Sequence, residues 1–86
     1  MTRVFIPSVL RSYTGSGEVT TKGNTLDEVL TDLDRRFPGL RFRIVDEQDR
    51  IRRHIRVFVN GQQTVDLDCR LAASDEIHIV LALSGG

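Results

Sequence analysis

The 86-residue sequence has little of what secreted, membrane-spanning and metal-binding proteins depend on. Cys69 is its only cysteine, which excludes an internal disulfide, and no Cys or His pair has the spacing of a zinc site. No apolar run approaches the roughly 20 residues that cross a bilayer as a helix, and no secretion signal begins the chain. We therefore expect a cytoplasmic protein with no membrane contact, no bound metal and Cys69 as a small packing residue.

An excess of charge of one sign is also missing, because Lys plus Arg and Asp plus Glu total twelve each. No global field therefore favours nucleic acid or an anionic membrane. Eight of eleven arginines lie between Arg35 and Arg56, but acidic residues at 46, 47 and 49 interrupt them and no aromatic residue interleaves from 50 to 56. This pattern favours a solvated charged edge over nucleic-acid binding, and a docking element for a partner enzyme stays open.

The chain also lacks the P-loop pattern G-x-x-x-x-G-K-[ST], so it is not expected to bind ATP by itself as a P-loop protein would. A domain of this length buries a thin core, which makes a large internal active-site pocket unexpected. These absences direct attention to the surface and to the ends of the chain.

The first third of the chain predicts a hairpin and a helix. Residues 4–10 are apolar and β-branched and predict a first strand, residues 13–17 turn the chain, and residues 18–22 return antiparallel to the first strand. Thr25 and Glu28 form a capping box that starts a helix, which Pro38-Gly39 ends. The apolar stripe of this helix consists of Leu26, Val29, Leu30, Leu33 and Phe37.

The rest of the chain predicts further strands. Residues 40–54 predict a short strand or extended segment and then a polar loop. Residues 55–59 predict a strong strand, and Asn60-Gly61 supplies the positive φ angles of a type I′ turn, after which residues 62–65 pair back. Residues 77–82 predict the last strand.

This element order predicts an α+β fold, with a mixed sheet of four to five strands and one main helix packed on one face. If the first and last strands are parallel neighbours, the fold is a β-grasp, the ubiquitin-like fold. We assign residues 1–82 to this domain and residues 83–86 to a flexible tail. The tail ends in Gly85-Gly86, a pair that arises by chance in about 0.5% of chains, and glycines keep it narrow enough to enter another protein's active site.

A set of short motifs carries a family resemblance over essentially the whole chain. The motifs are Ile6-Pro7-Ser8-Val9-Leu10-Arg11, Thr14-Gly15, Gly23-Asn24-Thr25-Leu26, Phe37-Pro38-Gly39 and Val57-Phe58-Val59-Asn60. With the terminal glycines, they make the chain resemble the ThiS/MoaD family of ubiquitin-like sulfur carrier proteins, and most of all the CysO type of thiocarboxylate-dependent cysteine biosynthesis. The departures are Ser74-Asp75-Glu76 in place of an Asp-Gly-Asp turn, and Leu83-Ser84 where Val-Ala often precedes the glycines.

The resemblance implies a protein co-substrate and not an enzyme. It implies that an E1-like enzyme uses ATP to adenylate the carboxylate of Gly86, and that a sulfur donor protein or sulfide converts it to a thiocarboxylate. Ser84, Gly85 and Gly86 are then expected to enter the active site of an acceptor synthase, which is cysteine-synthase-like or the large subunit of molybdopterin synthase. The chain itself is expected to bind no cofactor.

Three alternative functions stay open at this point. The chain resembles, somewhat less, the small subunit of molybdopterin synthase, whose tail inserts into a larger catalytic subunit. It is also compatible with a ubiquitin-like protein modifier, whose Gly86 would end in an isopeptide bond. The third alternative is a passive ubiquitin-like interaction domain that does not use the terminal glycines.

Strand alternation predicts two different faces of the sheet. The residues expected to face the helix are Val4, Ile6, Val57, Val59, Ile77 and Ile79. Phe5, Pro7, Phe58 and Val80 then lie on the other side, where apolar side chains on an open face suggest a docking site for a partner. The alternative is that one or two of the phenylalanines belong to the core.

Overall fold

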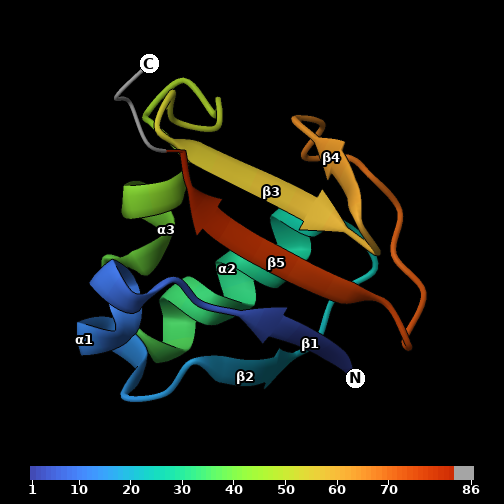
Figure 1. The fold of residues 1–86 in the computed structure, drawn as a ribbon. Helices are drawn as coiled ribbons and strands as arrows, with labels where there is room; N and C mark the ends of the chain where they lie inside the picture. Colours follow the sequence, from blue (N-terminus) through green and yellow to red (C-terminus); the bar gives the residue numbers. More distant parts are fainter. Residues whose placement is uncertain (83–86) are drawn as a thin grey trace.

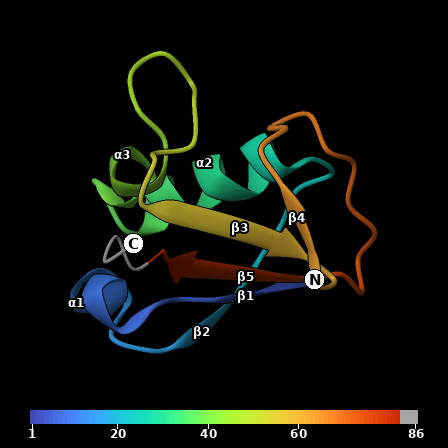
Figure 2. The same ribbon diagram turned by 45° about the horizontal axis from the view of Figure 1, so that its top comes forward.

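The computed structural model describes residues 1–82 as a five-stranded sheet with helices on one face (Figures 1 and 2). The strands are β1 (Thr2–Phe5), β2 (Glu18–Thr21), β3 (Ile55–Val59), β4 (Gln62–Thr64) and β5 (Glu76–Leu81). The helices are the 3-10 turn η1 (Ser8–Leu10), α1 (Arg11–Thr14), α2 (Leu26–Arg36) and α3 (Leu40–Ile44). No helix within residues 1–82 is long and apolar enough to cross a membrane.

The strand order is β2-β1-β5-β3-β4, so the last strand of the chain lies at the centre of the sheet. β1 and β5 run parallel, with Val4 opposite Ile77, and the other neighbouring pairs are antiparallel. This parallel pair between the first and last strands confirms the β-grasp fold. The mixed sheet and the main helix on one face agree with the sequence prediction.

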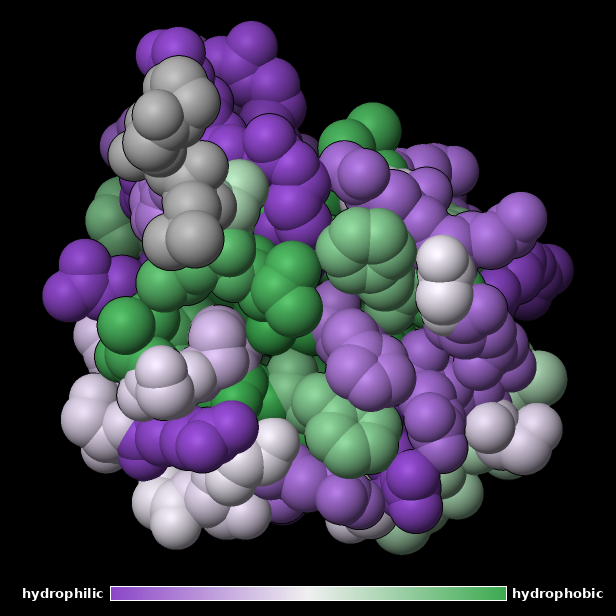
Figure 3. All heavy atoms as spheres, viewed as in Figure 1, coloured by the Kyte–Doolittle hydropathy of each residue, from purple (hydrophilic) through white to green (hydrophobic). Residues whose placement is uncertain are grey.

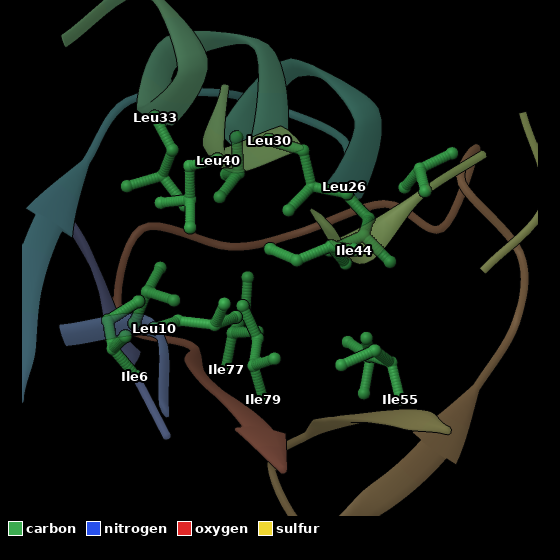
Figure 4. Packing of buried hydrophobic residues seen from close by; sticks show 14 residues of the cluster. Ile6, Leu10, Leu26, Leu30, Leu33, Leu40, Ile44, Ile55, Ile77 and Ile79 are labelled. Atoms are coloured by element: carbon green, nitrogen blue, oxygen red, sulfur yellow. The ribbon is translucent and has the colours of Figure 1, made fainter. Parts of the chain in front are cut away.

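A single cluster of buried side chains joins α2 to the sheet (Figure 4). Leu26, Leu30 and Leu33 point from α2 towards Ile77 and Ile79 on β5, and all five are at most 1% exposed. Burying side chains of this size contributes roughly 1.5–3 kcal/mol each, relative to leaving them exposed. The stripe predicted from the sequence therefore anchors the helix, although Phe37 at its end is only half-buried.

The start of α2 is capped as the sequence predicts. The Oγ1 of Thr25 accepts a hydrogen bond from the N–H of Glu28 at 3.2 Å. The Glu28 carboxylate accepts the N–H of Asn24 at 2.9 Å, one residue before the cap residue itself. Such a cap contributes about 1 kcal/mol to helix stability.

The prediction of one strand over residues 4–10 is wrong in its second half. β1 ends at Phe5, and after Pro7 the chain winds through η1 and α1 until Gly15, whose φ of 71° ends the helix. The rigid ring of Pro7 and its missing N–H end the strand pairing there. As a result Val9 is 58% exposed, whereas Leu10 is buried in the core.

The prediction of a strand or extended segment after Gly39 is also wrong, because residues 40–44 form α3. Leu40 and Ile44 are fully buried on one side of this helix, and Phe42 on the other side is 53% exposed. The polar loop that follows is present as predicted, and an isolated bridge between Val45 and Ile51 closes it. This yellow-green loop projects from the body of the molecule (Figure 2).

The turn after β3 is confirmed, because Asn60 and Gly61 have φ values of 50° and 85°. Asn60 also ties this turn to the start of β5, which the sequence did not reveal. Its side-chain amide donates to Asp75 at 2.8 Å, and its side-chain oxygen accepts the N–H of Glu76 at 2.9 Å. The hairpin β3-β4 and the central strand are thereby fixed to each other at one edge.

Candidate functional site

The residues predicted to carry the chemistry, Ser84, Gly85 and Gly86, lie outside the described residues 1–82. The structure does define where the chain leaves the sheet towards them. The N–H of Ala82 donates to the carbonyl of His54 at 2.8 Å, which extends the pairing of β5 with β3 by one bond. The end of the central strand is therefore held against the start of β3.

A pocket of about 310 Å³ lies beside this exit point, between η1, α1, α3 and the start of β3. Its lining residues are Val9, Leu10, Ser12, Tyr13, Arg43, His54, Ile55 and Leu81. The Nε of Arg43 donates to the hydroxyl of Tyr13 at 2.9 Å, which joins α3 to α1 across one side of the pocket. The exit of the chain thus has an apolar floor with cationic and hydroxyl groups at its rim.

The described residues contain no set of three His, Cys, Asp or Glu side chains that could hold a metal ion. Cys69 is half-buried and packs against the core cluster, in line with the packing role predicted for it.

The open face of the sheet carries a row of three rings across three strands. Phe5 on β1 lies opposite His78 on β5, and His78 lies opposite Phe58 on β3. The rings of Phe5 and His78 stack with their centroids 4.3 Å apart and their planes 7° apart. Stacking of this kind fixes both rings in place, so the centre of the open face is a firm, partly apolar platform.

Two of the four residues predicted as a docking site, Phe5 and Phe58, belong to this platform. Phe5, Pro7 and Phe58 are half-buried, and Val80 is 38% exposed, all outside the buried cluster under α2. Hydrophobic atoms gather on this face towards the end of β5 (Figure 3). Pro7 follows the end of β1 rather than standing on a strand. The phenylalanines are therefore surface residues and not core, and their part in docking remains a prediction.

The set of residues predicted to face the helix is confirmed except for Val59, which is only partly buried. Buried residues on the inner face of the sheet include Val4, Ile6, Val57, Ile77 and Ile79, while Val59 at the end of β3 is half-buried. The sequence prediction did not place His78 on the open face. His78 lies between the inward-facing residues Ile77 and Ile79 and therefore points to the same side of the sheet as Val80. Strand alternation alone was a sufficient signal for its position.

This geometry defines the chain as a ubiquitin-like protein whose C-terminal segment leaves the sheet from its central strand. The chain belongs to the ThiS family, whose model matches residues 4–86. The sulfur carrier protein CysO of Mycobacterium tuberculosis is 30% identical over 89 residues, which cover 96% of this chain and 96% of that protein.

Solved structures agree with this assignment. The chain is similar to the crystal structure of the BexX/CysO complex from Amycolatopsis orientalis, with a TM-score of 0.91, 32% identity and 100% coverage of both chains. It is also similar to small archaeal modifier protein 1 from Methanosarcina acetivorans, with a TM-score of 0.82, 28% identity and coverage of 99% and 95%. The chain is a sulfur carrier protein of the ThiS/CysO type, which is a small protein carrier and not a catalyst.

Proposed function

We propose that this carrier transports sulfur as a thiocarboxylate on Gly86 and delivers it to an acceptor synthase of cysteine biosynthesis. The similarity to a CysO protein over 96% of the chain supports this choice of pathway. The observation that carries the proposal is the hydrogen bond from Ala82 to His54, because it fixes the point from which four further residues run to Gly86.

Activation of the terminal carboxylate is the first chemical step. A carboxylate oxygen of Gly86 attacks the α-phosphate of ATP on an E1-like enzyme, forming an acyl adenylate and releasing pyrophosphate. Hydrosulfide, supplied as such or by a donor protein, then attacks the acyl carbon, and AMP leaves with the electron pair of the C–O bond. The product is a thiocarboxylate, in which sulfur has replaced one oxygen of Gly86.

The carrier contributes position in each of these steps. Glycines 85 and 86 have no Cβ atoms, so a partner needs only a narrow channel to admit them. The open sheet face and the pocket beside the exit supply surfaces on which a partner's channel can be aligned. The CysO protein of Amycolatopsis orientalis was solved in complex with BexX, and a docked complex of this kind is what we propose for the acceptor synthase here.

The test is the intact mass of the protein after incubation with the E1-like enzyme of its host, ATP and sulfide. We expect a mass gain that matches the replacement of one oxygen by sulfur. A variant without Gly86 is the control and should show no gain. If an enzyme that is active on another carrier produces no gain on this one, the proposal is wrong. Copurification with a cysteine-synthase-like protein tests the acceptor.

A second candidate function is covalent modification of other proteins. The similarity to an archaeal protein named as a small modifier favours it, with 28% identity over 99% of this chain. In that case Gly86 forms an isopeptide bond with a lysine of a target. Because Lys22 is the only lysine of this chain, extended self-linked chains are not expected, and single attachments in cell extracts are the diagnostic product.

A further inference from the structure

The arginines of the described chain fall into two groups. Five of them form ion pairs with carboxylates, and these are Arg3, Arg35, Arg36, Arg41 and Arg50. The other six have no carboxylate of residues 1–82 within 4.0 Å. Four of these six lie in the segment from α3 to β3, and the remaining two are Arg11 and Arg70. We call Arg43, Arg52, Arg53 and Arg56 the basic collar.

The basic collar lies around the point where the chain leaves the sheet. Arg43 lines the same pocket as Leu81, and Arg53 immediately precedes His54, whose carbonyl holds Ala82. Arg56 on β3 lies opposite Val80 on β5. In Figure 3 strongly hydrophilic atoms accordingly adjoin the hydrophobic area at the end of β5. Positive charge therefore lies beside the point where the chain leaves the sheet.

Neutral acceptors hold three of these guanidinium groups without cancelling their charge. Besides the bond from Arg43 to the hydroxyl of Tyr13, Arg52 donates to the carbonyl of Phe42 at 2.7 Å. Arg56 donates to the carbonyl of Arg53 at 2.6 Å. These bonds limit the side-chain rotation that a partner would otherwise have to freeze on binding. The collar is thus partly ordered in advance and still carries its positive charge.

The nearest loop offers little compensation for this charge. Asp46 accepts the backbone N–H groups of Arg50 and Gln48, which hold the pKa of its carboxyl below the usual range. Asp49 lies 3.4 Å from Arg41. The hydrogen bonds of Asp46 and the ion pair of Asp49 therefore go to groups outside the collar, and Arg52 is the one collar arginine whose charge also lowers the pKa of Asp46. Because the whole chain has a net charge of zero, the positive end is a local feature and not a consequence of composition.

We propose that the basic collar docks on acidic side chains that rim the active-site channel of the E1-like activating enzyme. This inference rests on the proposed function. The exposed side chains Val9 and Phe42 lie next to the collar and supply apolar contact within the same footprint. Activation brings the carboxylate of Gly86 towards the anionic phosphates of ATP, and positive charge beside the exit lowers this repulsion and speeds encounter.

Nucleic acid is a weaker candidate for the same surface. Base stacking needs open aromatic faces, whereas the guanidinium of Arg52 lies over the ring of Phe42 at 4.5 Å and covers one face of it. Asp46, Glu47 and Asp49 also place acidic charge on the adjoining loop. A partner with a defined acidic rim fits this mixed surface better than a uniformly charged polyanion.

The experiment compares two charge reversals of equal size. Arg53→Glu changes the collar, and Arg70→Glu changes an exposed arginine in the segment between β4 and β5, which lies away from the end of β5 (Figure 1). Both variants are made in a chain that ends at Ser84, so that docking is measured without any chemistry on the tail. Calorimetry with the purified E1-like enzyme of the host gives the dissociation constants at low and high salt.

We expect Arg53→Glu to weaken binding by about tenfold or more at low salt and Arg70→Glu by less than about twofold. High salt should reduce this difference, and Arg53→Lys should restore most of the affinity. Equal effects of the two reversals overturn the inference. The inference is also overturned if binding of single-stranded RNA depends on Arg53 and binding of the enzyme does not.

The same variants in the full chain separate this inference from the proposed function. If the wild-type protein gains sulfur and Arg53→Glu gains it at the same rate under limiting enzyme, the docking role of the basic collar is wrong and the proposed function stands. If wild type itself gains no sulfur, the carrier function fails first. A slower gain for Arg53→Glu than for Arg70→Glu supports both.

Discussion

Ala82 is bonded through its N–H to the carbonyl of His54 at 2.8 Å, and this is the last described contact before the terminal residues. It anchors the central strand to the start of β3 at the edge where the pocket opens. Four residues of the sequence follow this bond, and the last of them is Gly86. In the function proposed above, the number of residues between Ala82 and Gly86 therefore limits how far the carboxylate can reach into a partner.

Removal of Leu83 and Ser84, with the two glycines joined to Ala82, tests this limit. The deletion shortens the reach by about 7 Å while it leaves every described contact in place. We expect thiocarboxylate formation, followed by intact mass, to fall by about 100-fold or more because misplacement by even 1 Å is costly. Replacement of both residues by alanine keeps the length and should retain most activity. Equal loss in both variants would show that side chains, and not length, matter.

Val80 provides a test of the predicted docking site on the open sheet face. Val80→Glu places a charge beside the platform of Phe5, His78 and Phe58, and should weaken binding of the activating enzyme or acceptor by about tenfold. Val65→Glu is the matched control because Val65 is 73% exposed and lies beyond β4. Both variants should keep the thermal stability of wild type. Similar binding by the two variants would remove Val80 from the interface.

Asp32 holds β2 to α2 and tests the buried polar contacts. Its carboxylate accepts the N–H of Lys22 at 3.3 Å and pairs with Arg35 and Arg36. Burial alone raises the pKa of Asp32, but these three partners outweigh it and the net pKa is lowered. Asp32→Ala should cost about 2–3 kcal/mol in the free energy of unfolding, measured by urea denaturation. Asp32→Asn keeps an acceptor oxygen for the N–H of Lys22 and should cost less. An equal cost of the two variants would contradict a contribution from that hydrogen bond and would leave the charge alone to explain the loss.

Asp75 predicts a pH dependence of stability. The N–H of Ala72 and the side-chain amide of Asn60 lower the pKa of its carboxyl below the ordinary 3.8. A lowered pKa in the folded state stabilises the fold above about pH 3.8, and this contribution is lost as the pH falls through the folded value. Asp75→Asn should therefore lower the melting temperature at pH 7, with the difference from wild type shrinking in acid. A difference that is constant across this range would be inconsistent with titration of Asp75.

Local signals explain what the sequence predicted correctly. Thr25 and Glu28 have the spacing of a capping box. Asn60-Gly61 is the residue pair preferred in type I′ turns, because both residues tolerate positive φ angles. Strand alternation likewise placed Phe58 and Val80 on the open face. Each of these predictions depends on residues within four positions of one another, so no tertiary contact was needed to make it.

The two wrong elements arise from ambiguity in short segments. Leu40, Phe42 and Ile44 alternate as in a strand, yet a helical turn also places Leu40 and Ile44 on one side and Phe42 on the other. Asp32 shows a different limit, because its burial depends on the N–H of Lys22, which only the folded chain brings near. The sequence showed the arginine-rich segment from Arg35 to Arg56 but not which of its arginines lack an ion-pair partner, since only the folded chain brings the distant carboxylates near.

The parallel pairing of β1 with β5 separates the start of the chain from the exit of the carrier. Arg3 lies opposite Glu76, so Met1 stands at the edge where β5 begins, whereas Ala82 stands at the opposite edge (Figure 1). A fluorophore, affinity handle or sensor surface attached through Met1 is therefore remote from the edge at which Ala82 leaves the sheet. A chain immobilised through Met1 is therefore expected to present the edge with Ala82 to the solution.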